Sequence, residues 1–204
     1  MDGFEKRRQN KKEAILTASL ELFKEFGYNK VTVAEIAKRA SVSQVSIYNF
    51  FESKENLKKE LIRKLLKEHI TSSLNILETC DTIKIKFEKL ILSRIDYFKS
   101  FSSHFIIESI DSKVFRKEIG RYLPKEYVDE EDYKKLINAI QNLFEEGKKE
   151  GIFNDSIPTQ VILYFIEMFQ TYLITNPSVI QEFENNPVLS KDIFSLLLYG
   201  LLKR

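Results

Sequence analysis

The start signals of two short helices, separated by a tight turn, constrain this chain more than any other feature. Thr32 precedes an apolar run and Glu35 follows it by three residues, which is the spacing of a capping box at a helix N-terminus. Ser43 stands as a second N-cap, and Val42 and Ile47 occupy the two positions of a hydrophobic staple around it. The sequence therefore predicts one short helix after Thr32 and a second after Ser43, joined at a fixed angle.

The two short helices differ in the side chains that they leave for solvent. The first has one apolar face at helical spacing, formed by Val33, Ile36, Ala37 and Ala40. The second exposes small polar side chains, and a helix-turn-helix presents a second helix of this kind to the DNA major groove. The residues expected to point toward the groove are Ser43, Gln44, Val45, Ser46 and Asn49. Glutamine and asparagine suit the edge of adenine, and valine can pack on a thymine methyl group.

The residues around this motif resemble the N-terminal domain of the TetR (tetracycline-repressor-like) family of bacterial transcription regulators. The resemblance covers roughly residues 10–62 and is carried by Ile15-Leu16-Thr17-Ala18, Glu21-Leu22-Phe23, Phe26-Gly27-Tyr28, Ile47-Tyr48-Asn49-Phe50-Phe51 and Ser53-Lys54-Glu55-Asn56-Leu57. Two residues depart from the family pattern, which usually has glycine at the position of Ser41 and often has glycine at that of Val45.

The resemblance implies an all-α chain with two domains. Residues 1–55 are expected to form a three-helix, helix-turn-helix DNA-binding domain, and residues 56–204 a helical domain for effector binding and dimerisation. Thr32, Tyr48 and Lys54 match family positions that contact backbone phosphate. The basic residues near the N-terminus form either a DNA-binding arm or a solvated, disordered tail, and they are Lys6, Arg7, Arg8, Lys11 and Lys12.

Charge is distributed unevenly along the chain, although its net value is only +2. Residues 1–64 contain 14 basic and 9 acidic residues, whereas the remaining residues contain 18 basic and 21 acidic ones. A basic first third suits contact with phosphate. No apolar run approaches the ~20 residues that span a bilayer, and the first residues lack the apolar core of a secretory signal. One cysteine, Cys80, excludes an internal disulfide. We therefore expect a cytoplasmic protein without a membrane partner.

Capping residues and apolar spacing predict helices throughout the rest of the chain. One helix is expected over residues 10–26, and another is expected to run without a break over residues 53–77. The later helices are expected to begin at Asp81, at the acidic run 129–132, at Ser156 and at Ser190.

The aromatic residues of the second half are candidates for an effector pocket. The chain has 16 Phe and 9 Tyr, and most of these lie beyond residue 86. In the family that the chain resembles, this domain holds a small molecule that lowers the affinity for DNA. An apolar effector is expected to bind among Arg94, Phe98, Phe105, Phe144, Phe165 and Phe169. Ordinary core packing is the alternative for each aromatic residue.

The last two predicted helices are apolar on nearly every side, so they need burial from more than one direction. In the resembled family, these helices of two subunits build a four-helix dimer interface. A homodimer is expected through Phe165, Tyr172, Phe194, Leu198 and Leu201. Packing within one chain is the alternative.

The motifs favour transcriptional regulation over catalysis. The two histidines, His69 and His104, lie 35 residues apart without a metal-ligand cluster, and the sequence has no Gly-rich phosphate loop or nucleophile elbow. We expect a repressor that binds a double-stranded DNA operator and is released by a small-molecule effector, with no cofactor and no enzymatic activity. One alternative is a DNA-binding protein whose second domain binds a protein partner and senses no metabolite. Another is a helical bundle whose helix-turn-helix binds protein.

Overall fold

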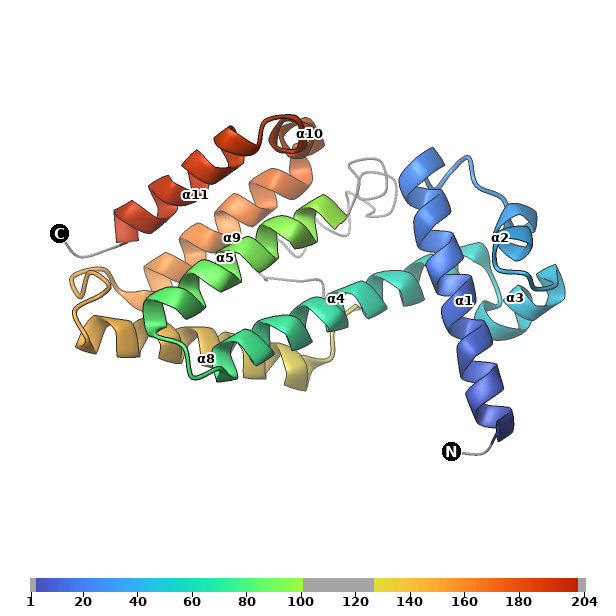
Figure 1. Cartoon of the computed structure of the whole chain (residues 1–204), viewed down its shortest axis with the longest axis horizontal. Helices are drawn as coiled ribbons and strands as arrows, with labels where there is room; N and C mark the ends of the chain where they lie inside the picture. The colour runs from blue at the N-terminus through green and yellow to red at the C-terminus, as the bar shows by residue number, and fades with distance from the viewer. Residues whose placement is uncertain (1–2, 101–126, 202–204) are drawn as a thin grey trace.

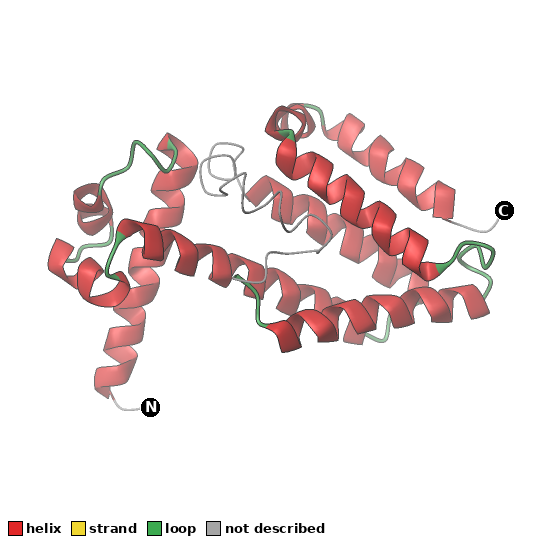
Figure 2. Cartoon of the chain, turned by 180° about the vertical axis from the view of Figure 1, so that it is seen from behind, coloured by secondary structure: helices red, strands yellow, loops and turns green. Residues whose placement is uncertain are grey.

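The computed structural model describes residues 3–100 and 127–201, and these are helical apart from short connections (Figures 1 and 2). The helices are α1 (Gly3–Phe26), α2 (Val33–Arg39), α3 (Gln44–Phe51), α4 (Lys54–Glu78), α5 (Ile83–Ser100), α8 (Glu130–Lys149), α9 (Thr159–Thr175), α10 (Pro177–Asn185) and α11 (Pro187–Leu201). The first three form a small unit, and α5 and α8–α11 form a larger bundle, with α4 joining the two (Figure 1). The all-α prediction is confirmed. Among the described helices, none is both long enough and apolar enough to cross a membrane.

The three-helix unit forms because each helix turns an apolar face toward the same centre. Ile15 and Phe23 of α1, Ile36 of α2 and Ile47 of α3 are all 0% exposed. They pack in one cluster, to which α4 contributes Leu57. Burying a side chain of this size contributes about 1.5–3 kcal/mol. The cluster therefore holds α2 and α3 at a fixed angle, as the staple around Ser43 predicts.

The helix α4 is a single unbroken helix that leaves the three-helix unit and enters the bundle, as predicted. Ser53 caps it, because its hydroxyl accepts a backbone N–H of the first turn at 3.1 Å. In both views α1 crosses α4 near this end (Figures 1 and 2). The cluster of the three-helix unit continues along α4 through Leu66 to Leu173 of α9 and Phe183 of α10. Apolar packing is therefore continuous across the predicted domain boundary after residue 55, and that boundary stays a prediction.

A second apolar cluster holds the larger bundle together. The ring of Phe144 in α8 lies 5.6 Å from that of Phe87 in α5 and 5.1 Å from that of Phe153, measured between centroids. Gly147 permits the approach of Phe153, since a Cβ atom at this glycine would lie 2.3 Å from the ring. As predicted, α8 begins at the acidic run, where Asp129 accepts two backbone N–H groups of the first turn at 2.9 and 3.2 Å.

The start of α1 differs from the prediction. The helix begins at Gly3 rather than near Asn10, so the basic residues near the N-terminus lie on the first turns of α1. Of the two alternatives for these residues, the structure contradicts the disordered tail. The charged residues of this segment have good helix propensity, which apolar spacing does not register.

The start of α5 also differs from the prediction. The carboxylate of Asp81 accepts hydrogen bonds from the hydroxyl of Thr79 at 2.8 Å and from Nζ of Lys89 at 2.6 Å. The hydroxyl of Thr82 accepts a backbone N–H of the first turn of α5 at 3.4 Å instead. Asp81 therefore stabilises the connection that precedes α5, and Thr82 occupies the capping position.

The C-terminal helices depart from their expected positions as well. The helix α9 begins at Thr159, because the N–H and hydroxyl of Ser156 bond to an asparagine side chain two residues earlier. A helix that was not predicted, α10, has Pro177 in its first turn. Proline is favourable there, since that N–H has no partner within a helix, whereas the sequence pattern indicates only the end of α9. The helix α11 begins at Pro187 rather than after Ser190.

Candidate nucleic-acid interface and effector cavity

The exposed face of α3 carries four of the side chains expected at DNA. Ile47 is buried in the cluster of the three-helix unit, whereas Val45 and Tyr48 are 65% and 48% exposed. Gln44 and Asn49 are exposed as well. Helical spacing places these four side chains on one side of α3. Two amides, an aliphatic side chain and a phenol therefore form a continuous surface that can contact base edges and phosphate.

Ser43 and Ser46 differ from these four because their hydroxyl groups are bonded to each other at 2.9 Å. The Oγ atom of Ser43 also accepts the backbone N–H of Ser46 at 3.1 Å, so the predicted cap of α3 is confirmed. A contact between either serine and DNA would require its hydroxyl to turn outward. Their groove-facing role stays a prediction.

The turn between α2 and α3 is a Schellman motif with serine in place of glycine. Ser41 has a φ of 54°. The N–H of Val42 donates to the carbonyl of Ala37 at 2.9 Å, and the N–H of Ser41 donates to that of Lys38 at 3.3 Å. Glu52, directly after α3, has a φ of 65° and was not anticipated. The backbone therefore has a positive φ at a non-glycine residue after each of the two short helices, at Ser41 after α2 and at Glu52 after α3.

Thr32 and Glu35 form the capping box that the sequence predicts. The hydroxyl of Thr32 accepts the N–H of Glu35 at 3.2 Å, and Glu35 Oε2 accepts the N–H and the hydroxyl of Thr32, each at 2.7 Å. These hydrogen bonds from Thr32 hold the pKa of Glu35 below its ordinary value. A charged carboxylate therefore lies beside the position at which Thr32 is expected to contact phosphate.

Lys54 contacts the connection between α1 and α2. Its Nζ donates to the carbonyl of Tyr28 at 2.6 Å and lies 4.2 Å from the centroid of that ring. The hydroxyl of Tyr28 donates to Glu55 at 2.8 Å, and Glu55 pairs at 2.8 Å with Lys58, which is buried over the same ring. Burial, followed by the bond and charge of Glu55, raises the pKa of Tyr28. Lys54 therefore fastens α4 to the connection between α1 and α2, and its contact with a phosphate stays a prediction.

Ion pairs also join α4 to α1. The carboxylate of Glu60 accepts hydrogen bonds from Nζ of Lys12 at 3.0 Å and from Nη1 of Arg63 at 3.2 Å. Lys64, on the next turn of α4, pairs with Glu13 of α1. The hydrogen bond from Lys12, together with that from Arg63, holds the pKa of Glu60 below its ordinary value. Glu60 therefore remains charged and links α1 of the three-helix unit to Arg63 of α4.

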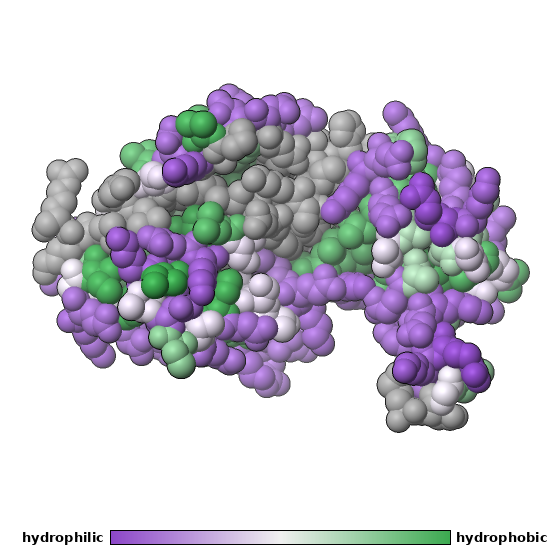
Figure 3. Space-filling view, viewed as in Figure 1, coloured by the Kyte–Doolittle hydropathy of each residue, from purple (hydrophilic) through white to green (hydrophobic). Residues whose placement is uncertain are grey.

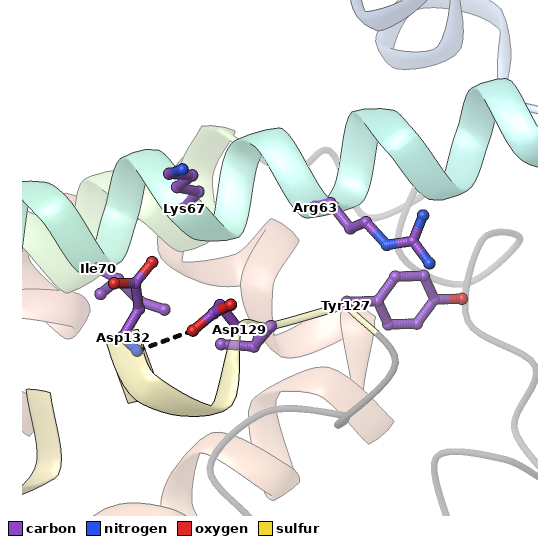
Figure 4. A pocket seen from close by; sticks show the side chains of 7 residues that line it. Arg63, Lys67, Ile70, Tyr127, Asp129 and Asp132 are labelled. Carbon is purple, nitrogen blue, oxygen red and sulfur yellow. Dashed lines mark hydrogen bonds between the residues drawn. The ribbon is translucent and has the colours of Figure 1, made fainter. Parts of the chain in front are cut away.

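A cavity of about 310 Å³ lies between α4 and the start of α8 (Figure 4). It is lined by Arg63, Lys67 and Ile70 of α4 and by Tyr127, Val128, Asp129 and Asp132. The lining combines two cationic and two anionic groups with an apolar surface, and Arg63 is the residue that also pairs with Glu60. Sequence reasoning missed this site because its two walls come from distant segments. The available signal was the spacing of Arg63 and Lys67, which places both on one side of α4.

The aromatic residues predicted for the effector do not line this cavity. Phe144 is 1% exposed within the second cluster, and Phe165 is 45% exposed on α9. Phe169 packs against the first cluster. The side chains of Arg94 and Phe98, and the whole of Phe105, lie outside the described part of the chain. The role of these six residues stays a prediction.

The outer side of α9 exposes an apolar stripe at helical spacing. The stripe consists of Val161, Tyr164, Phe165, Met168 and Tyr172, each 45–64% exposed. Two of the predicted dimer residues, Phe165 and Tyr172, therefore lie on a surface that the single chain leaves open. The side chains of the other three, Phe194, Leu198 and Leu201, lie outside what the structure describes.

Known proteins share both the motif and the fold. Residues 15–61 match the family model of bacterial regulatory proteins, tetR family. The uncharacterised HTH-type transcriptional regulator YhgD of Bacillus subtilis (strain 168) is 24% identical over 162 residues, which are 78% of this chain and 81% of YhgD.

Two solved structures match the fold over nearly the whole chain. The fatty acid degradation regulator FadR of Bacillus halodurans has a TM-score of 0.67 at 22% identity, covering 95% of this chain and 97% of FadR. FadR of Bacillus subtilis, crystallised with stearoyl-CoA, has a TM-score of 0.59 at 17% identity, covering 93% of this chain and 98% of that one. With its capped helix-turn-helix, its exposed α3 face and these matches, the chain belongs to the TetR family and is a DNA-binding transcription regulator.

Proposed function

We propose that this regulator is a repressor, which binds a near-palindromic operator as a homodimer and releases it when a small, largely apolar effector binds. The observation that carries the proposal is the continuity of α4. This helix begins beside α3, contains no glycine or proline, and passes the cavity at Arg63 and Lys67. A displacement of one end of α4 is therefore transmitted to the other end.

In this proposal the exposed face of α3 reads the bases. Gln44 and Asn49 hydrogen-bond adenine, Val45 packs on a thymine methyl, and Tyr48 contacts phosphate. Thr32 and Lys54, at the starts of α2 and α4, position the unit on the backbone. The exposure of the four α3 side chains on one side supports this assignment.

The α9 stripe supports the homodimer. A large apolar surface on a soluble chain marks an interaction site, and a two-fold axis allows the stripe to pack against its own copy. A two-fold dimer that reads two half-sites places its recognition helices about 34–36 Å apart, or a small multiple of this distance.

An acyl-CoA is the first effector to test. FadR of Bacillus subtilis, which has the same fold, was crystallised with stearoyl-CoA. The cavity offers Ile70 and Val128 to an apolar group and Arg63 and Lys67 to an anionic one, and Asp129 and Asp132 restrict where that anionic group can lie. The predicted aromatic residues of α8 and α9 remain candidates for contact with the acyl chain.

A ligand shifts the populations of two states only when its affinities for them differ. Release of DNA therefore requires that the effector bind more tightly to a dimer whose recognition helices do not fit two half-sites. An anionic group that binds Arg63 would compete with Glu60, and Glu60 would then hold Lys12 of α1 in a changed geometry. A coupling free energy of about 1–3 kcal/mol corresponds to a change of about 5- to 150-fold in operator affinity.

A reciprocal titration tests the proposal. A duplex that the wild-type protein selects from a random pool serves as operator, and stearoyl-CoA is titrated into free and DNA-bound protein. We expect weaker stearoyl-CoA binding to the DNA-bound form, by the same factor by which stearoyl-CoA weakens operator binding. Coenzyme A without an acyl chain is the control. Equal affinities in the two forms would show that stearoyl-CoA is not an inducer and would favour the alternative of a protein partner.

A further inference from the structure

The helix α1 extends beyond the packing that the three-helix unit requires. Its first buried residue is Ile15, whereas the helix begins at Gly3. The additional turns project from the unit (Figure 1). In this projecting part, which we define as residues 3–12, even Phe4 is 65% exposed. Burial of apolar surface therefore does not explain why the chain keeps these turns.

The projecting part is strongly basic, and much of its charge has no partner within the described chain. Arg8 pairs with Glu5 at 3.8 Å, and Lys12 pairs with Glu60 at 3.0 Å. The other cations, Lys6, Arg7 and Lys11, are exposed, and among the described residues no acidic group pairs with them. Figure 3 shows the projecting end of α1 as a mainly hydrophilic surface.

Two contacts set the projecting part beside the recognition helix. The guanidinium carbon of Arg8 lies 5.6 Å from the ring centroid of Phe50, and Nζ of Lys12 lies 5.8 Å from that of Phe51. Both rings belong to α3, and Phe50 directly follows Asn49 of the exposed face. The projecting part therefore lies beside α3, the helix whose exposed face we assign to DNA. Its side chains stand on a helix that is already formed, so binding requires little additional ordering of the backbone.

We propose that Lys6, Arg7 and Lys11 form a second DNA-contact surface, which binds backbone phosphates flanking the half-site read by α3. The inference rests on the proposed role of α3. Charge complementarity identifies duplex DNA as the partner. When unpaired cations of the protein neutralise phosphates, the counterions condensed on the DNA are released, which favours binding. Phosphate contacts carry no base information, so this surface adds affinity without changing base preference.

The test compares the salt dependence of operator binding in three full-length proteins. The variant Lys6→Gln/Arg7→Gln/Lys11→Gln removes the unpaired cations. The control Lys84→Gln/Lys86→Gln/Lys149→Gln removes the same charge from the larger bundle, at lysines without a described ion pair. The DNA is a duplex selected by the wild-type protein from a random pool, and circular dichroism verifies that each protein remains helical.

We expect the slope of log affinity against log salt to fall by about 0.9 for each phosphate that the variant no longer neutralises, or about 2.7 for three, with base preference retained. The control should keep the wild-type slope. Equal slopes for wild type and variant, on DNA that both still prefer over a scrambled duplex, would overturn the inference and leave the proposed function intact. Binding to phosphatidylglycerol vesicles is measured for the same proteins. If the variant lost vesicle binding but kept the wild-type slope on DNA, the inference would be overturned and the proposed function would stand. A wild type without any preference for the selected duplex would overturn both.

Discussion

Ser41 occupies the position after the end of α2, where helices most often place glycine. Its φ of 54° lies in the left-handed region, which costs a non-glycine residue about 1–2 kcal/mol. Both hydrogen bonds of the Schellman motif form nevertheless. The sequence predicted this turn because its signals, the caps at Thr32 and Ser43, are local. Glu52 also precedes a cap, Ser53, but nothing in its residue type indicates the φ of 65° that it adopts.

Ser41→Gly should raise the free energy of unfolding by up to about 1 kcal/mol, since glycine adopts this φ without strain but gains entropy in the unfolded chain. Ala40→Gly is the matched control. Ala40 has a φ of −80°, so glycine brings no relief there and should lower stability. Urea unfolding measures both variants. A clear loss of stability in Ser41→Gly would mean that the serine hydroxyl stabilises the turn locally.

Gly147→Ala should destabilise the larger bundle although alanine is the better helix former. An added Cβ would lie 2.3 Å from the ring of Phe153, which is fully buried and cannot move aside. Overpacking costs about 1–3 kcal/mol, whereas the gain in helix propensity is about 1 kcal/mol. Gly3→Ala is the control, because no heavy atom lies within 4 Å of its added Cβ. A thermal melt in which Gly147→Ala gained stability would contradict the packing described around Phe153.

The helices differ in how far the sequence predicts them. The starts of α2, α3, α4 and α8 follow from caps that are read within one turn. The start of α1 was not predicted, because its first turns are highly charged and show no apolar period. The helix α10 was not predicted either, because it is short and begins with a proline. The pairing of α1 with α4 through Glu60 is a tertiary contact, which local patterns do not reveal.

The pH dependence of stability tests that pairing. Glu60 has a lowered pKa in the folded chain, so its contribution is complete above its ordinary pKa of about 4.3 and is lost as the pH falls through the lower folded value. Glu60→Gln should therefore destabilise the protein at neutral pH, and the difference from wild type should shrink below about pH 4. Glu68→Gln, at an exposed ion pair of 3.9 Å, should show a smaller effect. A difference that did not vary with pH would contradict the pairing.

The molecule as a whole combines the exposed face of α3, which lies within one continuous motif, with a larger bundle whose surfaces are assembled from distant segments. The sequence predicts that the polar side chains of α3 share one surface, because one helix places them together. The cavity brings Arg63 of α4 beside Tyr127, and only the fold creates that proximity. Phe144, Phe165 and Phe169 were grouped by residue type, and the structure distributes them over three environments.

The dimer prediction concerns the α9 stripe. Met168→Glu or Tyr172→Glu should give a folded monomer, because each side chain is more than half exposed in the single chain, while a charge at a buried interface is strongly unfavourable. Leu92→Glu on α5, where the side chain is 59% exposed, is the control and should leave the dimer intact. Sedimentation of the wild type as a folded monomer at micromolar concentration would rule out the proposed assembly.

The central claim is that the exposed face of α3 reads DNA, and the most direct measurement is the base preference of Gln44→Ala. Wild type, Gln44→Ala and the phosphate-contact variant Tyr48→Ala are each presented with a random pool of duplexes. We predict that Gln44→Ala loses discrimination at particular positions, by about 1–3 kcal/mol for a bidentate contact. Tyr48→Ala should bind all sequences more weakly while keeping the wild-type preference. An unchanged base preference in Gln44→Ala would contradict the account.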